Sequence, residues 1–248
     1  MSGIDEKGAI PFRGSACVLL SGGMDSTACL HWALSKHKEV RALGFDYGQP
    51  HRDAELTVAG TLARKHSVPF EIVVLADTMH AGLLSGVPKH ELPTQAIHRA
   101  FVPGRNLIFL SIALGRICQW WPLVEELDIV IGACAEDAAG FPDCSQDFLK
   151  AAQKALSAAV ARQIHVASPY SKMTKEQMLR DVELRFPSGI EDIQVSWSCY
   201  AGKGPCGECT ACVLRSRALA AAGLEDLSAV PVMHGGDTHR DHVLKGAE

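Results

Sequence analysis

The sequence predicts an α/β fold in which a doubly wound, parallel sheet is covered by helices on both faces. Short continuous apolar runs alternate with longer segments of helical spacing along the 248 residues, and no internal repeat or low-complexity tract interrupts them. Such runs are typical of strands buried on both faces, and an intervening helix joins them as parallel neighbours. The length fits one large domain, or one domain with a small appendage.

Each strand is expected where a short run rich in Val, Ile and Leu is bounded by turn or charged residues. These runs are residues 16–20, 40–45, 70–75, 127–133 and 164–167. Helical spacing predicts helices over residues 26–37, 52–66, 106–121, 146–163 and 208–222. Two stretches break the alternation: residues 76–103, whose Gly and Pro content indicates a mobile active-site cover, and residues 186–207 before the last helix.

Charge and hydropathy exclude several classes of protein. The chain has 28 acidic and 24 basic side chains, a formal charge of −4, so we expect no broad basic field and no direct binding to nucleic acid. No apolar run approaches the roughly 18 residues of a membrane span. The first 14 residues carry charges and Pro11 where a signal peptide would need an apolar core. We therefore expect a cytoplasmic protein with no membrane partner.

A glycine-rich motif, Ser-Gly-Gly-Met-Asp-Ser at residues 21–26, lies between the first expected strand and the first expected helix. Open α/β sheets bind ligands at this position, where glycines allow a close backbone approach and the helix N-terminus attracts an anion. The motif fits neither a Walker loop nor a dinucleotide fingerprint. Because a carboxylate in an anion site needs a cation beside it, we expect Asp25 to bind magnesium held by a polyphosphate. A plain turn with a Ser or Asp N-cap is the alternative.

Four of the nine cysteines fall within fourteen residues near the C-terminus: Cys199, Cys206, Cys209 and Cys212. Short Cys-x2-Cys spacings deliver thiolates from one turn, and four soft ligands suit a tetrahedral zinc ion. A closed shell of four thiolates leaves no open position, so this zinc is expected to be structural. An iron–sulfur cluster and a redox Cys-x2-Cys pair remain as alternatives.

The glycine-rich motif resembles the Ser-Gly-Gly-x-Asp-Ser loop of the N-type ATP pyrophosphatases, or PP-loop enzymes, which cleave ATP between its α and β phosphates. The resemblance implies a Rossmann-like fold of the adenine nucleotide alpha hydrolase type, with ATP as co-substrate and magnesium as its partner. It also implies that the loop and the first helical turns hold the nucleotide: Leu20, Ser21, Gly22, Gly23, Met24, Asp25, Ser26, Thr27, Ala28, Cys29 and Leu30.

Further motifs distinguish among the PP-loop families. They are Phe-Asp-Tyr-Gly-Gln-Pro-His at residues 45–51, Phe-Val-Pro-Gly-Arg-Asn at 101–106, Gly-Phe-Pro-Asp-Cys at 140–144 and Ser-Cys-Tyr at 198–200, before the cysteine pairs. Together they resemble the QueC family of 7-cyano-7-deazaguanine synthases from about residue 16 to residue 223. The resemblance implies a homodimeric ligase that converts 7-carboxy-7-deazaguanine and ammonia to the nitrile through adenylated intermediates, in the pathway to queuosine.

The family resemblance also implies a domain division and a set of site residues. Residues 15–190 would form the ATP pyrophosphatase domain and 191–223 the zinc-binding loop with the last helix, between an extension at 1–14 and a tail at 224–248. The expected catalytic residues are Asp25, Ser26 and Arg105. The expected substrate-binding residues are Tyr47, Gln49, His51, Asn106 and Asp143.

Several of these side chains have a second interpretation. Asp143 either accepts hydrogen bonds from the deazaguanine edge or caps the following helix. His51 and Glu55 would share a helix face and either meet the substrate or form a surface ion pair. Lys172 and Lys175 are either phosphate contacts or solvated surface residues.

Two departures from the family pattern do not undo the resemblance, and two other functions are weighed beside it. Pro50 stands where the family commonly has Arg, and Ala-Glu-Asp at residues 135–137 is less polar than expected at a strand exit. One alternative is a PP-loop enzyme that adenylates another substrate, such as a tRNA thiolase, which would need a reactive thiol, Cys134 or Cys144, near the loop. The other is a zinc-binding nucleotide sensor without catalysis.

Overall fold

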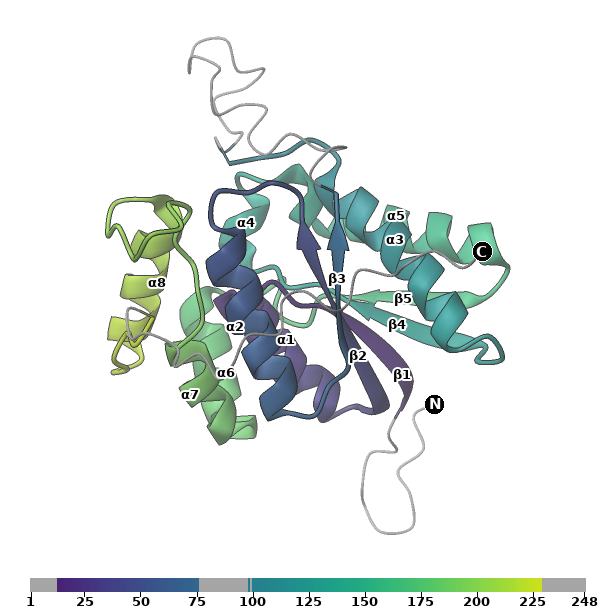
Figure 1. The fold of residues 1–248 in the computed structure, drawn as a ribbon, viewed down its shortest axis with the longest axis horizontal. Coiled ribbons are helices and arrows are strands. Elements are labelled where there is room, and N and C mark those ends of the chain that lie inside the picture. Colours follow the sequence, from purple (N-terminus) through teal and green to yellow (C-terminus); the bar gives the residue numbers. More distant parts are fainter. Residues whose placement is uncertain (1–12, 76–97, 99, 229–248) are drawn as a thin grey trace, which may run out of the picture.

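The computed structural model describes residues 13–75, 98 and 100–228 (Figure 1). Most of the expected insertion at 76–103, the extension before residue 13 and the tail beyond 228 therefore lie outside the described residues. Among the helices that are described, none has both the length and the apolar character needed to cross a membrane.

Five parallel strands form one sheet in the order β3-β2-β1-β4-β5, which confirms the predicted doubly wound arrangement (Figure 1). Their bounds are β1 (Arg13–Leu19), β2 (His37–Asp46), β3 (Phe70–Val74), β4 (Glu126–Val130) and β5 (Gln163–Ala167). From the central β1 the chain first adds strands on one side and then, at β4, on the other. Ligands bind at the carboxyl ends of strands where the order reverses in this way.

Helices cover both faces of the sheet. They are α1 (Met24–Leu34), α2 (Arg52–Lys65), α3 (Arg105–Trp120), α4 (Ala135–Ala138), the 3-10 turn η2 (Pro142–Cys144), α5 (Gln146–Val160), α6 (Lys175–Arg185), α7 (Pro187–Gln194) and α8 (Thr210–Ala221). One core joins α1, α2, α6, α7 and α8 to the sheet, and the other core joins α3 and α5 to the opposite face. The expected domain boundary at residue 190 falls inside α7.

Two predicted helices end earlier than their apolar spacing indicated. The helix expected over 26–37 stops at Leu34, because His37 starts β2 and its ring bonds to Asp128 of β4 at 2.9 Å. The helix expected over 146–163 stops at Val160, because Ala161 adopts a left-handed conformation with φ of 50° before β5 begins. Both helices end early because residues shortly after them belong to the next strand.

The apolar spacing gives no bounds for α6 or α7, although a helix start is expected near Lys172 and Lys175 and local signals mark both helices. Thr174 and Gln177 form a capping box at the start of α6, each side chain accepting from the other residue's backbone N–H. Pro187 stands in the first turn of α7, where its missing N–H costs no hydrogen bond. These two helices build much of the core behind α1.

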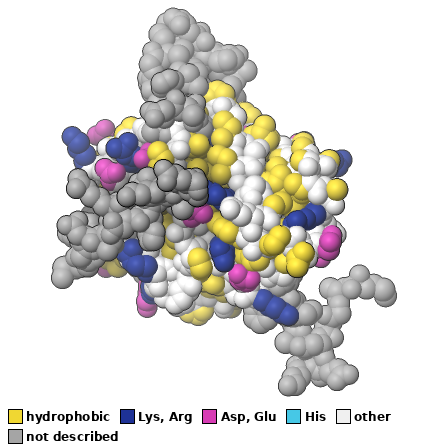
Figure 2. Space-filling view, turned by 45° about the vertical axis from the view of Figure 1, so that its right-hand side comes forward, with side chains coloured by type: hydrophobic (Ala, Val, Ile, Leu, Met, Phe, Trp, Pro, Cys, Tyr) yellow, Lys and Arg dark blue, Asp and Glu magenta, His cyan; other side chains and the backbone are white. Residues whose placement is uncertain are grey.

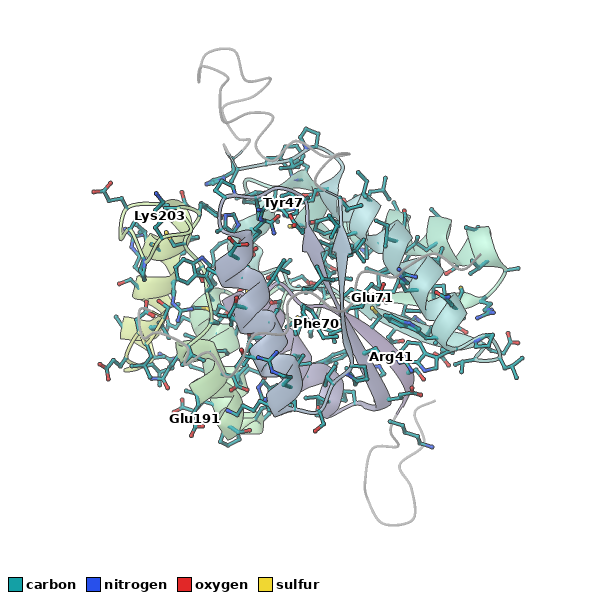
Figure 3. The ribbon with its side chains drawn as sticks, viewed as in Figure 1. Arg41, Tyr47, Phe70, Glu71, Glu191 and Lys203 are labelled. Atoms are coloured by element: carbon teal, nitrogen blue, oxygen red, sulfur yellow. The ribbon has the colours of Figure 1, made fainter. Side chains whose placement is uncertain are left out.

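A buried carboxylate ties three helices together at the end of the molecule opposite the carboxyl ends of the strands. Asp192 of α7 accepts hydrogen bonds from His31 of α1 at 2.9 Å, and from Lys65 and His66 at the end of α2 at 2.6 Å each. Its neighbour Glu191 lies low in Figure 3, far from Tyr47 at the upper end of the sheet. We expect this cluster to contribute to stability and not to the site.

Replacing Asp192 with Ala is expected to lower the free energy of unfolding by roughly 3 kcal/mol, because the buried His31, the half-buried His66 and Lys65 lose their acceptor. Burial alone would raise the pKa of Asp192, but the three donors lower it well below its usual range. A folded-state pKa below the unfolded one adds stability above about pH 4 and loses it as the pH falls further.

Urea unfolding at pH 7 and pH 3 measures both effects. Glu191→Ala, next in sequence and with a side chain 78% exposed, is the control and should cost little. An equal loss in both variants, or a loss from Asp192→Ala that does not shrink at pH 3, would contradict this role.

Candidate functional site

A loop at the carboxyl end of β1 leads directly into α1 and is pressed against α2. Gly22 has φ of +82°, and a Cβ there would lie 2.4 Å from the backbone oxygen of Glu55. Both the left-handed backbone and the close approach therefore require glycine. From the other side, a Cβ on Gly132 after β4 would lie 2.8 Å from the backbone nitrogen of Ser26. The loop is fixed between two neighbouring elements.

The N-terminus of α1 has no side-chain cap. Its N-cap residue is Gly23, so the alternative of a turn capped by Ser or Asp is wrong. The hydroxyls of Ser26 and Thr27 donate to the Gly23 carbonyl at 3.0 and 2.9 Å, and Ser21 contacts Ser26 at 3.1 Å. These bonds hold the loop's shape while leaving the helix N-terminus suited to an anion.

A buried ion pair lies beside this loop. Lys175, at the start of α6, donates to Asp25 at 2.6 Å and to Asp137 at 3.4 Å. Only 9% of Lys175 is exposed, so its interpretation as a solvated surface residue is wrong, whereas Lys172 is exposed as that interpretation expected. Burial alone would lower the pKa of Lys175, but the Asp25 carboxylate and its neighbours raise it. The ammonium is therefore charged, with two carboxylates around it.

Arg105 and Tyr47 come together across 58 residues of sequence. Arg105 is the first residue of α3, after Gly104 in a left-handed conformation, and it donates to the Tyr47 hydroxyl at 3.3 Å. Its guanidinium also stands 5.8 Å from the centre of the Tyr47 ring. Tyr47 follows β2, and burial raises the pKa of its hydroxyl. The structure thus places a half-buried cation beside a neutral phenol at the carboxyl end of the sheet.

Asp143 has an oxygen that no described group satisfies. Its Oδ2 accepts from the backbone N–H of Asn106 at 3.2 Å, and the Asn106 side chain donates to the Asp143 carbonyl at 3.0 Å. Its Oδ1 is buried without a hydrogen-bond partner among the described residues. The following helix is capped by Ser145 and not by Asp143, so the expected capping role was wrong. A buried, unpaired oxygen is costly, so it indicates a missing donor.

The turn after β2 carries Gln49 and His51. The Gln49 side chain accepts from the Tyr47 backbone at 2.9 Å and donates to the Phe45 carbonyl at 2.9 Å, so it shapes the turn. His51 precedes α2 and is buried, and its Nε2 lies 3.5 Å from the Glu55 carboxylate. The interpretation of this pair as a surface ion pair is therefore wrong.

The four clustered cysteines converge around one point. One sulfur from each of Cys199, Cys206, Cys209 and Cys212 lies within 4.8 Å of all the others. Backbone N–H groups of residues 206, 209 and 212 donate to the sulfurs of Cys199, Cys206 and Cys209 at 3.3 to 3.4 Å. Such donors lower the pKa of Cys206 to about 6. Four sulfurs at these separations fit one tetrahedral metal ion with bonds of about 2.3 Å.

The loop that carries the four cysteines, residues 199–212, also packs against the turn after β2. Gly202 has φ of +75°, and a Cβ there would lie 2.4 Å from the Pro50 carbonyl oxygen. The His51 ring donates through Nδ1 to the Tyr200 carbonyl at 3.2 Å. The cysteine loop and the turn that carries Tyr47 and His51 are therefore in direct contact.

The isolated cysteines near the loop are poor nucleophiles. Cys134 lies 3.5 Å from Asp25, and Cys144 accepts from Asn106 at 3.5 Å. Burial is the main cause that raises the pKa of Cys144 to about 12 and that of Cys134 further. A protonated thiol lacks the reactivity that sulfur transfer requires, which weakens the thiolase alternative.

Sequence reasoning missed Asp137 as a site residue. Its carboxylate accepts from the Cys134 backbone at 2.8 Å and from Lys175, and desolvation raises its pKa. The signal was the pair of acidic residues, Glu136 and Asp137, shortly after a buried strand. One ligand atom each from Asp25, Cys134 and Asp137 lies within 4.8 Å of the others.

Comparison with known proteins gives consistent matches over most of the chain. A family model described as queuosine biosynthesis protein QueC matches residues 15–223. A 7-cyano-7-deazaguanine synthase from Laribacter hongkongensis is 36% identical over 219 residues, covering 85% of this chain and 92% of the relative. One from Thermoplasma acidophilum is 35% identical, covering 86% and 91%. Among solved structures, the tRNA thiolase NcsA from Methanococcus maripaludis matches with a TM-score of 0.45 and 17% identity, covering 87% of this chain and 67% of the thiolase.

Proposed function

Since the chain belongs to the QueC family, we propose that it is a ligase that converts 7-carboxy-7-deazaguanine, ammonia and ATP into 7-cyano-7-deazaguanine. The observation that carries this proposal is the uncapped N-terminus of α1 beside Asp25, at the sheet edge that also holds Arg105 and Asp143. Such a site combines a place for phosphates with polar groups for a second, planar reactant.

The reaction needs an activating group because a carboxylate is a poor electrophile: its charge repels nucleophiles and oxide is a bad leaving group. Transfer of AMP to the carboxylate removes both obstacles, and ammonia then displaces AMP to give an amide. Adenylation of the amide oxygen allows elimination to the nitrile. No covalent bond to the protein is required, so the protein contributes orientation and charge stabilisation.

In this proposal residues 20–30 hold ATP, with its phosphates at the N-terminus of α1 and near the Ser26 hydroxyl. Asp25 would hold a magnesium ion, which when bound neutralises phosphate charge. Lys175 is the buried cation nearest this carboxylate, 2.6 Å away, and suits a phosphate contact. In this proposal each member of the ion pair also has a ligand of opposite charge: magnesium for Asp25 and a phosphate for Lys175.

Arg105 and Asp143 are proposed to recognise the deazaguanine substrate. The Arg105 guanidinium is a forked donor that matches the substrate's carboxylate, and Tyr47 holds it in place. The unpaired Oδ1 of Asp143 suits the N–H groups of the deazaguanine ring, while Asn106 fixes the orientation of this carboxylate. Gln49 and His51 shape the adjoining wall.

We propose a structural zinc ion in the four-cysteine site. The converging sulfurs and the closed ligand set support it. Residues 191–223 would then form a metal-stabilised element of the same unit as residues 15–190, since Cys199, Cys212 and Leu219 share the core of α1 and α6.

We also propose that the protein is a cytoplasmic homodimer and that it does not bind nucleic acid directly. Figure 2 shows hydrophobic side chains gathered on the surface of the face in view. The large exposed apolar side chains among the described residues include neighbours on α3, Leu107 and Ile108. An apolar patch of this kind is typical of a contact between subunits.

The direct test mixes the purified protein with 7-carboxy-7-deazaguanine, ammonium and magnesium ATP and follows products by mass spectrometry. The nitrile, AMP and pyrophosphate are the expected products. Formation of the amide alone would show that the second activation is missing. Absence of any product would overturn the substrate assignment and direct attention to Pro50, which replaces a cation common in the family.

A further inference from the structure

Two hydrogen-bond acceptors face each other where α2 begins. The Nδ1 of His51 lies 3.2 Å from the Tyr200 carbonyl, and because a carbonyl only accepts, Nδ1 carries the proton. Burial lowers the pKa of His51, so the ring is neutral at pH 7 and its Nε2 has a free lone pair. The Nε2 atom lies 3.5 Å from the Oε2 atom of Glu55. When Glu55 is ionised, both groups are acceptors, and they are held together only by a donor that comes between them.

Glu55 is also poorly satisfied elsewhere. The amide of Gln49 lies 3.4 Å away, longer than an ordinary hydrogen bond, and donates to Phe45 at 2.9 Å instead. Within residues 13–75, 98 and 100–228, no Lys or Arg forms an ion pair with Glu55, and Arg105 acts on its carboxyl only from a greater distance, lowering its pKa less than burial raises it. Burial raises the pKa of this carboxyl to about 7, and its side chain remains 17% exposed. A solute can therefore reach a carboxylate with spare acceptor capacity.

The position of Glu55 relates it to both halves of the site. Its backbone carbonyl packs on Gly22 of the nucleotide loop, and its side chain contacts Gln49, whose amide oxygen binds the Tyr47 backbone. Tyr47 in turn accepts from Arg105. Glu55 thus lies between the loop for ATP and the residues proposed for the deazaguanine substrate.

We propose that Glu55 and His51 bind the ammonium ion that supplies the nitrile nitrogen, and that Glu55 accepts one of its protons. This inference rests on the proposed function. Of the three reactants, ATP and the carboxylate substrate are anions, whereas ammonium is a small cation with donors for two acceptors. A negative group here would repel the anions, so its partner is the cation.

The proton transfer completes the amide-forming step. One N–H proton moves from ammonium to Glu55, and the freed lone pair forms the C–N bond to the adenylated carbonyl carbon. The bond from that carbon to the AMP oxygen breaks, and its electron pair leaves with AMP. A second N–H proton passes to solvent as the amide forms. A carboxyl that titrates near pH 7 suits this exchange, because it can accept and release a proton at that pH.

Glu55→Gln separates the ammonium step from adenylation. The ammonium concentration for half-maximal nitrile formation should rise at least tenfold, as expected when one charge-assisted hydrogen bond is lost. Exchange of labelled pyrophosphate into ATP, driven by 7-carboxy-7-deazaguanine without ammonium, should stay within twofold. Asp53→Asn, on the same helical turn with a side chain 95% exposed, is the matched control and should change neither value.

A second nucleophile tests the proton transfer itself. Hydroxylamine is largely uncharged at neutral pH, so its nitrogen lone pair is free without a proton transfer to Glu55, and the one proton lost on acylation passes to solvent as it does with ammonia. Glu55→Gln should therefore form the hydroxamate at a rate close to that of the unsubstituted chain. Glu55→Ala should show the same split if the Gln variant fails to fold.

The outcomes distinguish the two proposals. Normal exchange with an unchanged ammonium response, or an equal loss with ammonium and hydroxylamine, would overturn the assignment of Glu55 alone. Absence of exchange in the unsubstituted chain would overturn the proposed function, and this inference with it.

Discussion

Replacement of Asp25 with Asn is expected to reduce nitrile formation by about 10² to 10³, the range seen when one group that stabilises transition-state charge is removed. The carboxylate stands in the first turn of α1 and pairs with Lys175 at 2.6 Å. Asn keeps the size of the side chain but removes the charge that a magnesium ion requires. The loss should therefore appear in turnover and not in folding.

Steady-state kinetics at saturating ATP and thermal unfolding measure the two properties separately. Asp147→Asn is the matched control, because this residue is also acidic and in the first turn of a helix, α5, yet is exposed and outside the site. Normal turnover by the Asp25 variant would remove this residue from its metal-binding role. A melting temperature well below that of the unsubstituted chain would instead show that the ion pair with Lys175 stabilises the fold.

The second large effect is expected from Cys206→Ser, which should lose the metal ion and lower the free energy of unfolding by at least about 3 kcal/mol. Cys206 is exposed, so the substitution creates no cavity in the core, and the loss would come from the metal. The effect should spread beyond the loop, because Cys199 and Cys212 belong to the core that also contains α1.

Metal analysis and chemical unfolding test this prediction. The unsubstituted chain should carry about one zinc ion, which is colourless. Absorption of visible light would instead indicate an iron–sulfur cluster. Cys118→Ser, at an isolated half-buried cysteine, is the control and should retain the metal. An unchanged metal content and melting temperature in the Cys206 variant would refute a structural metal site.

The sheet, the glycine loop and the cysteine cluster could be predicted because their signals are local. A short apolar run, the motif at residues 21–26 or a pair of Cys-x2-Cys spacings needs no knowledge of distant contacts. The predicted strands match β1 to β5 with shifts of a few residues at their ends.

The errors concern side chains whose environment is built by distant elements. Lys175 resembles an exposed helix-start lysine until α6 packs against α1 and brings it to Asp25, 150 residues away in sequence. Asp143 resembles a cap for the helix that follows it, but it binds the second residue of α3, 37 residues earlier. Spacing along the chain contains no information about such contacts.

The contact between the cysteine loop and the turn after β2 would couple the binding of a metal ion by the four cysteines to the binding of substrate. Gly202 packs on Pro50, and Tyr200 holds the His51 ring, so a change in the geometry of either segment shifts the other. Coupling of this kind is reciprocal: if the metal improves substrate affinity by some factor, bound substrate must tighten metal retention by the same factor. The metal ion would thereby act as an effector of a reaction in which it takes no chemical part.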